Sequence, residues 1–128
     1  MSDLKDKIVS YIKRAQEDFG ITLVTEGWGS KITKCACPLG CALLANDIDI
    51  TDDPEQNGAE AADLLGVSEK WIESFIYGFD EGLGHVENEE AYQLGLVIRM
   101  ELNPTSHTDY INNLDRTVIK FTPATEIK

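Results

Sequence analysis

The sequence lacks a long apolar run, an even set of cysteines and an apolar leader. Its longest apolar stretch lies near residues 35–45, whereas a membrane-spanning helix needs roughly 20 apolar residues. The first residues, Met-Ser-Asp-Leu-Lys-Asp, mix charges and contain no signal core, so we expect neither export nor membrane insertion. Three cysteines without a secretory signal are typical of a reducing compartment. The sequence therefore predicts a cytoplasmic protein with free thiols.

The common catalytic motifs are absent as well. The chain contains no G-x-S-x-G nucleophile turn, no phosphate-binding glycine loop, no H-E-x-x-H motif and no G-x-G-x-x-G motif. Carboxylates are plentiful, but carboxylates spread over an acidic surface do not indicate acid–base catalysis. We therefore predict a non-enzymatic protein that uses no cofactor.

Basic residues are scarce in one long segment. Residues 47–90 hold fourteen acidic residues and one basic residue, Lys70, a net charge of −13 in a chain whose total is −12. Such a field repels phosphate backbones and anionic membranes and attracts basic partners. We predict a binding or regulatory protein whose acidic 47–90 face binds a basic protein. One version of this role is a decoy that takes the place of nucleic acid on that protein. We expect neither nucleic acid nor a membrane as a partner. The residues expected to bind the partner open this segment: Asp47, Asp49, Asp52, Asp53 and Glu55.

Length and composition indicate one small globular domain over residues 1–128. The chain is 42% hydrophobic and 27% charged, which is ordinary for a domain of this size. Helical periodicity recurs along the chain and predicts a mainly α fold, a bundle of about five or six helices. Residues 21–25 fit a loop or an edge strand. They would form a two-stranded β element if they pair with 117–121; otherwise the tail from about 104 is expected to pack loosely.

Helix boundaries follow from capping residues. An amphipathic run that Ser2 caps ends at Gly20. A second run opens at Pro38, which suits a first helical position, and it has no charged residue before Asp47, so we expect it to be the buried central helix. Asp53-Pro54 favours another helix start and Asn57-Gly58 favours a turn.

The later helices are predicted in the same way. Ser68 caps one helix and Asn88 caps the last, which Asn103-Pro104 ends. The first of these carries an apolar stripe that we expect in the core: Trp71, Ile72, Phe75, Ile76 and Phe79.

Residues 61–75 resemble the core of a helix-turn-helix. Ala62 lies four residues before the turn glycine Gly66, and Ile72 and Phe75 fall where the second helix packs on the first. The same spacing is found in a plain helical hairpin. We favour the hairpin over a divergent helix-turn-helix regulator, because the outward side of the second helix would present two acidic residues and one basic residue, which weakens contact with DNA phosphates. The residues that the pattern turns outward are Ser68, Glu69, Lys70, Glu73, Ser74 and Tyr77.

Cys35, Cys37 and Cys41 form a C-x-C-x₃-C cluster, and they carry the runner-up hypothesis of a metal or redox site. His85 or His107 could complete a set of four zinc ligands. The spacing differs from the paired C-x-x-C of common zinc sites, so thiols packed in the core are the simpler interpretation. Cys37 falls at a predicted helix start, where a thiol pKa can be lowered.

A calcium loop of the EF-hand type is not predicted. A loop that begins at Asp47 would place Asp49 third and Thr51 fifth, which is tolerable. It would then need Gly sixth and Glu twelfth, where this chain has Asp52 and Gly58.

Overall fold

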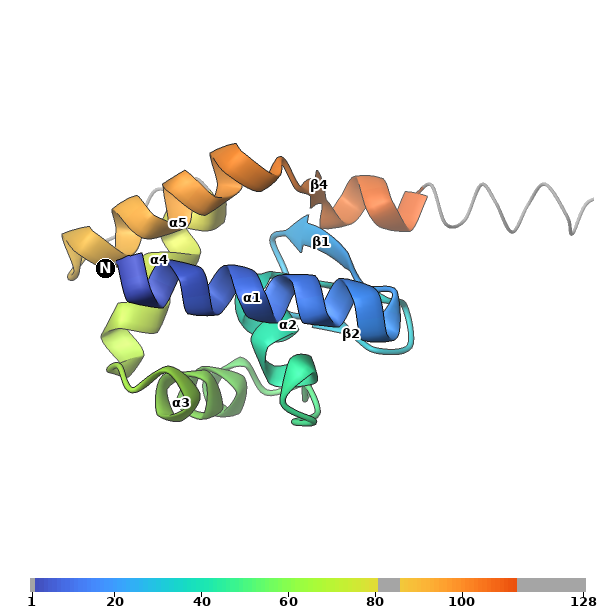
Figure 1. The fold of residues 1–128 in the computed structure, drawn as a ribbon, viewed down its shortest axis with the longest axis horizontal. Coiled ribbons are helices and arrows are strands. Elements are labelled where there is room, and N and C mark those ends of the chain that lie inside the picture. Colours follow the sequence, from blue (N-terminus) through green and yellow to red (C-terminus); the bar gives the residue numbers. More distant parts are fainter. Residues whose placement is uncertain (1, 81–85, 113–128) are drawn as a thin grey trace, which may run out of the picture.

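The computed structural model describes residues 2–80 and 86–112, and these form helices joined to a small sheet (Figure 1). The elements in chain order are α1 (Ser2–Phe19), β1 (Thr22–Thr25), β2 (Gly29–Ser30), β3 (Cys35–Ala36), α2 (Pro38–Ala45), α3 (Pro54–Leu65), α4 (Glu69–Asp80), α5 (Glu89–Leu102) and β4 (Thr105–Ser106). Residues 107–112 form a further helical segment. The prediction of a mainly α fold is confirmed.

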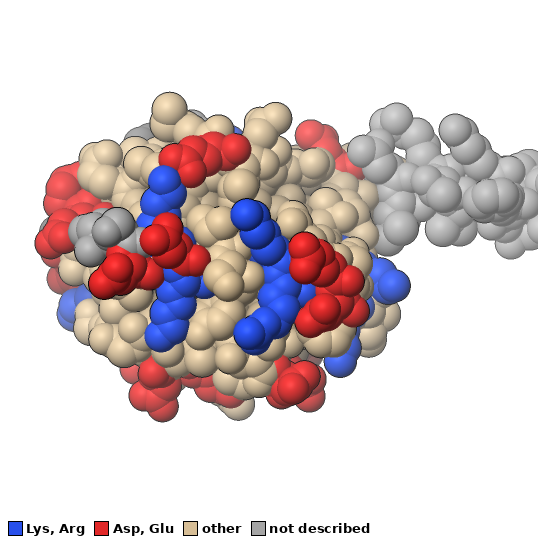
Figure 2. Space-filling view, viewed as in Figure 1, with Lys and Arg blue, Asp and Glu red and all other residues tan. Residues whose placement is uncertain are grey.

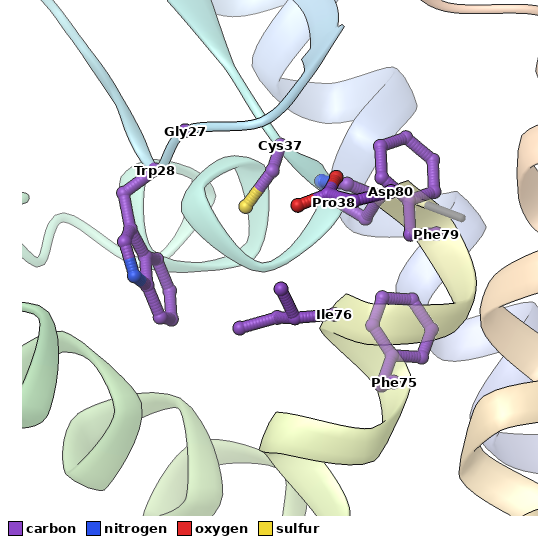
Figure 3. A pocket seen from close by; sticks show the side chains of 8 residues that line it. All are labelled: Gly27, Trp28, Cys37, Pro38, Phe75, Ile76, Phe79 and Asp80. Carbon is purple, nitrogen blue, oxygen red and sulfur yellow. The ribbon is translucent and has the colours of Figure 1, made fainter. Parts of the chain in front are cut away.

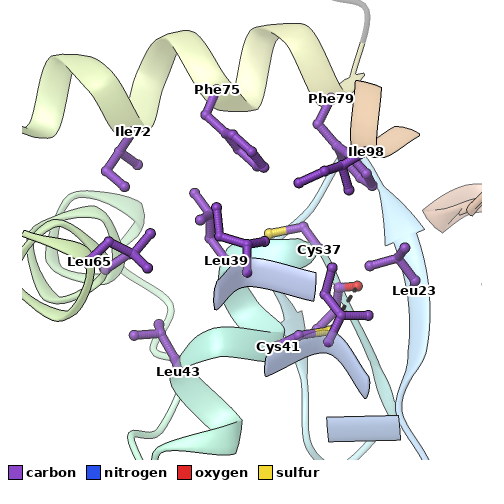
Figure 4. Close-up of a cluster of buried hydrophobic side chains, with 14 of the residues drawn as sticks. Leu23, Cys37, Leu39, Cys41, Leu43, Leu65, Ile72, Phe75, Phe79 and Ile98 are labelled. Atoms are coloured by element: carbon purple, nitrogen blue, oxygen red, sulfur yellow. Dashed lines mark hydrogen bonds between the residues drawn. The ribbon is translucent and has the colours of Figure 1, made fainter. Parts of the chain in front are cut away.

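The helix α2 lies at the centre, as its lack of charge predicted. All its residues from Pro38 to Leu44 are buried, and it packs against α1 on one side and α3 on the other. Pro38 is the first helical residue and Cys37 is the N-cap. Figure 4 shows side chains of α2 meeting the apolar face of α4 in the core.

The sheet differs from the prediction of a loop or an edge strand over 21–25. Its order is β2-β3-β1-β4, so β1 is interior and pairs in parallel with β3 (Thr22 with Cys35) and with β4 (Val24 with Thr105). Because β1 is mostly buried, the backbone groups on both its edges need partners. The predicted partner, 117–121, lies outside the described residues.

The helix α3 corrects a second expectation. It begins at Pro54 after the cap Asp53, as predicted, but Asn57-Gly58 lies within the helix and does not form a turn. Asn57 is buried, and its amide accepts a hydrogen bond from the Thr51 N–H and donates one to the Thr51 carbonyl, each 2.9 Å long. These bonds satisfy the amide inside the helix and hold the preceding loop against it.

The helices α4 and α5 pack closely side by side. The Ser68 hydroxyl caps α4 and the Asn88 side chain caps α5, as predicted. A Cβ on Gly78 would overlap the Tyr92 carbonyl, and one on Gly95 would overlap that of Phe75. Glycine is therefore required where the two backbones approach each other.

The apolar stripe of α4 lies in the core as predicted. Trp71, Ile72, Phe75 and Phe79 are buried, and Ile76 is partly buried. Among the described residues no helix is both long and apolar enough to cross a bilayer.

Candidate functional site

A cavity lies where the loop between β1 and β2 faces α4 across the start of α2. It has a volume of about 210 Å³, and Figure 3 shows the side chains around it. We call it the inner cavity, lined by Gly27, Trp28, Cys37, Pro38, Phe75, Ile76, Phe79 and Asp80. The Trp28 carbonyl accepts a hydrogen bond from the Cys37 N–H (3.2 Å). It also lies so close to Gly40 that no side chain would fit there, so the start of α2 fixes the Trp28 loop.

A second hollow adjoins the inner cavity, because Trp28 and Ile76 line both. We call it the outer cleft; its volume is about 230 Å³. The remaining residues that line it come from α3 and α4: Pro54, Glu55, Gly58, Glu69, Ile72 and Glu73. Three carboxylates therefore line the same hollow as the apolar side chains of Trp28, Ile72 and Ile76, which we call its apolar floor.

Asp80 is the acidic residue of the inner cavity and is half-buried. Its Oδ1 accepts a hydrogen bond from the Glu26 N–H (2.9 Å). Burial raises the pKa of Asp80, and the negative charge of Glu26 adds to this, while that hydrogen bond and the charge of Arg99 act in the opposite direction. Among the described residues, none donates a hydrogen bond to its other oxygen, Oδ2.

The thiol of Cys37 faces the same cavity. It accepts a hydrogen bond from the Gly40 N–H (3.3 Å) in the first turn of α2. Burial nevertheless raises the pKa of Cys37 to about 12, so the thiol is protonated at neutral pH. The helix start does not produce the reactive thiolate that a redox or nucleophilic role requires.

The three cysteines do not converge on a metal site. Each sulfur has its own local partner: the Thr33 hydroxyl for Cys35, the Gly40 N–H for Cys37 and the Ala36 carbonyl for Cys41. Over residues 2–80 and 86–112, no three His, Cys, Asp or Glu side chains are placed to hold a metal ion. His107 packs beside Gly27, and His85 lies outside the described residues. The metal hypothesis for these cysteines therefore gains no support.

The five acidic residues predicted to bind a partner have different surroundings. Asp47, Asp49, Asp52 and Asp53 are exposed and line neither the inner cavity nor the outer cleft, and Asp53 caps α3 by accepting a hydrogen bond from the Glu55 N–H (3.0 Å). Glu55 alone of the five lines the outer cleft.

Two carboxylates of the cleft, Glu69 and Glu73, belong to the acidic 47–90 face but were not among the five residues predicted to bind the partner. They are spaced i, i+4 on the exposed side of α4, next to the apolar stripe. This spacing is the feature of the sequence from which the pair could have been identified.

Most residues that the helix-turn-helix pattern turned outward are exposed, but Ser74 is not. It is buried, and its hydroxyl accepts a hydrogen bond from the Asn88 N–H (3.0 Å) at the start of α5. Lys70, the single base of the acidic segment, forms an exposed ion pair with Glu87 (2.7 Å). The outward side of α4 therefore offers acidic groups and hardly any free positive charge.

Both signs of charge mix on the face that presents α1, where Figure 2 shows lysine and arginine side chains between acidic ones. The outer cleft differs, because the charged residues that line it, within the part of the chain that the structure describes, are all acidic. Comparisons with family models, with curated proteins and with solved structures found no match.

Proposed function

We propose that this protein is a non-enzymatic binding protein that holds a basic segment of a partner protein in the outer cleft. One observation supports the proposal: Glu55, Glu69 and Glu73 line the same hollow as an apolar floor that includes Trp28 and Ile76. An acidic surface alone is common, whereas carboxylates around an apolar hollow match a ligand that is both cationic and hydrophobic.

The two parts of the cleft would act differently. The carboxylates speed the approach of a basic chain and orient it, and each of them adds a modest amount of affinity in water. The apolar floor supplies the affinity by burying the aliphatic stems of lysine or arginine, and the indole of Trp28 also attracts a cation. We expect this binding protein to act in the cytoplasm, since its three cysteines are free, buried thiols.

The test compares two variants that change net charge equally. Glu55→Gln/Glu69→Gln/Glu73→Gln removes the carboxylates of the cleft, and the control Asp6→Asn/Glu17→Gln/Asp18→Asn removes three acids of α1. Binding of short peptides that alternate arginine with leucine is measured by calorimetry at physiological salt. The cleft variant should lose about tenfold in affinity, on the order of 0.5 kcal/mol per carboxylate.

The control variant should bind nearly as well as the unaltered protein. Equal losses in both variants would mean that the peptides respond to net charge alone, and that result would contradict a specific cleft. No binding of any basic peptide would contradict the proposed function altogether.

A further inference from the structure

The described residues that line the inner cavity combine apolar walls with one carboxyl group, that of Asp80. Figure 3 shows Trp28 on one side and Phe75 and Phe79 on the other, with Asp80 beside Phe79. The Cys37 thiol is neutral at neutral pH. Among the described residues that line the cavity, Asp80 is therefore the one whose side chain can carry charge at neutral pH.

The volume of the cavity suits a short chain of carbon atoms. An apolar cavity of about 150 Å³ is large enough to take up benzene, and the inner cavity measures about 210 Å³. Sites of this kind hold the apolar body of a ligand, while a few placed polar groups fix its orientation. An aliphatic chain of four or so carbons, with one polar end at Asp80, meets both conditions.

The charges around Asp80 favour a cationic end. Glu26 adds negative charge beside it, and Arg99 supplies the nearby positive charge while its guanidinium donates to the Phe79 carbonyl (3.0 Å). The effect of burial is larger than that of Arg99, so the pKa of Asp80 is raised and its ionised form is disfavoured. A ligand cation at the second oxygen would offset this cost, because an opposite charge at close range stabilises the ionised form.

We propose that the inner cavity binds an aliphatic chain that ends in a guanidinium or an ammonium group. The stem lies between Trp28 and the rings of Phe75 and Phe79, and the cationic end pairs with Asp80. The proposed function supplies the source of this chain: an arginine or lysine side chain of the basic segment in the adjoining outer cleft. Trp28 and Ile76, which line both hollows, join the two.

The test uses the side chain alone as the probe. Trp71→Phe leaves Trp28 as the single tryptophan of the two in the chain, so its fluorescence reports on the cavity. n-Butylguanidine and n-butylamine are titrated in the millimolar range, and n-butylurea serves as the uncharged match of the guanidine. Both cations should change the Trp28 emission with saturation, and the urea should bind about tenfold more weakly, the loss of roughly one charge-assisted hydrogen bond.

The carboxyl is tested by Asp80→Asn, which keeps an oxygen to accept the Glu26 N–H. This variant should bind the guanidine and the urea equally. The control Asp49→Asn makes the same change of charge away from the cavity and should keep the preference for cations. A melting curve of each variant confirms that it is folded.

Three results would overturn the proposal: no saturable change with either cation, equal binding of the urea by the unaltered protein, or a preserved preference in Asp80→Asn. A basic peptide in which citrulline replaces arginine separates this failure from failure of the proposed function. If basic peptides bind and the citrulline peptide binds equally well, the cavity proposal fails and the cleft remains. If n-butylguanidine binds and no peptide does, the cavity takes a small free amine or guanidine, and the protein partner is wrong.

Discussion

At the scale of single residues, the carboxyl group of Asp80 has two opposing effects on the stability of the protein. Its carboxyl holds the loop before Trp28 through the Glu26 N–H, and it brings a poorly solvated negative charge into an apolar wall. The hydrogen bond needs only an oxygen, whereas the negative charge would have a use only in binding the cation that we propose. The charge therefore lowers the stability of the unliganded protein.

This conflict predicts the pH dependence of the free energy of unfolding. Because the pKa of Asp80 is raised above 3.8 in the folded state, the unfolded chain loses its proton first as the pH rises, and stability falls across that window. Asp80→Asn should therefore be more stable than the unaltered protein at pH 7, with the difference shrinking toward pH 3. Denaturant unfolding at both pH values measures it; a variant less stable by the same amount at both would contradict the burial of this charge.

Cys37 gives a second prediction for a single residue. A pKa of about 12 in place of 9.0 lowers the thiolate fraction at neutral pH about a thousandfold. Iodoacetamide should therefore alkylate Cys37 very slowly at pH 7.5 in the folded protein and rapidly after unfolding, as mass spectrometry of peptides would show. Fast alkylation of the native protein would contradict the protonated state and support the redox hypothesis.

At the scale of elements, the contact between α4 and α5 depends on two glycines. Gly78→Ala should push the Tyr92 backbone away and destabilise the protein by about 1–3 kcal/mol, the usual cost of overpacking. Gly58→Ala is the matched control, since its Cβ would meet only Ile72 at 3.9 Å. This control should stabilise α3 by up to about 1 kcal/mol through helix propensity. Thermal melts compare the two, and equal melting temperatures would mean that the helices are not in close contact at Gly78.

Helix ends were predictable because their signals are local. The side chains of Asp53, Ser68 and Asn88 each accept a hydrogen bond from a backbone N–H of the first helical turn, and Pro38 has no N–H that needs a partner at the first helical position. The structure confirms all four starts. The sheet was not predictable, because β3 and β4 have two residues each and gain stability only by pairing with a distant strand. The turn predicted at Asn57-Gly58 was wrong because of a contact outside the dipeptide. The buried side-chain amide of Asn57 forms hydrogen bonds with the Thr51 backbone, and these outweigh the local preference for a turn.

The candidate site was predictable only in its charge. The acidic residues in 47–90 indicated the negative charge around the outer cleft, and Glu55 was among the residues expected to bind a partner. Trp28 lies in the loop between β1 and β2, Cys37 just before α2 and Asp80 at the end of α4, and nothing in their spacing indicates that folding gathers them around one cavity.

At the scale of the whole molecule, the charge distribution predicts no binding to duplex DNA at physiological salt. The outward side of α4, where a recognition helix would contact phosphates, presents Glu69 and Glu73, and Lys70 is paired with Glu87. Phosphate contacts supply most of the affinity in such complexes, and this surface lacks them. An electrophoretic shift at sub-micromolar protein that weakens steeply with salt would contradict this prediction.

The most direct test of the binding site is an amide-resolved nuclear magnetic resonance titration with an arginine-containing peptide. If the cleft and the cavity bind the peptide, the largest shifts will fall on residues 27–28 and 69–80, while residues 47–53 and the outer face of α1 stay nearly unchanged. Shifts concentrated on 47–53, or spread evenly over all acidic residues, would show that the peptide follows charge alone and would contradict the site.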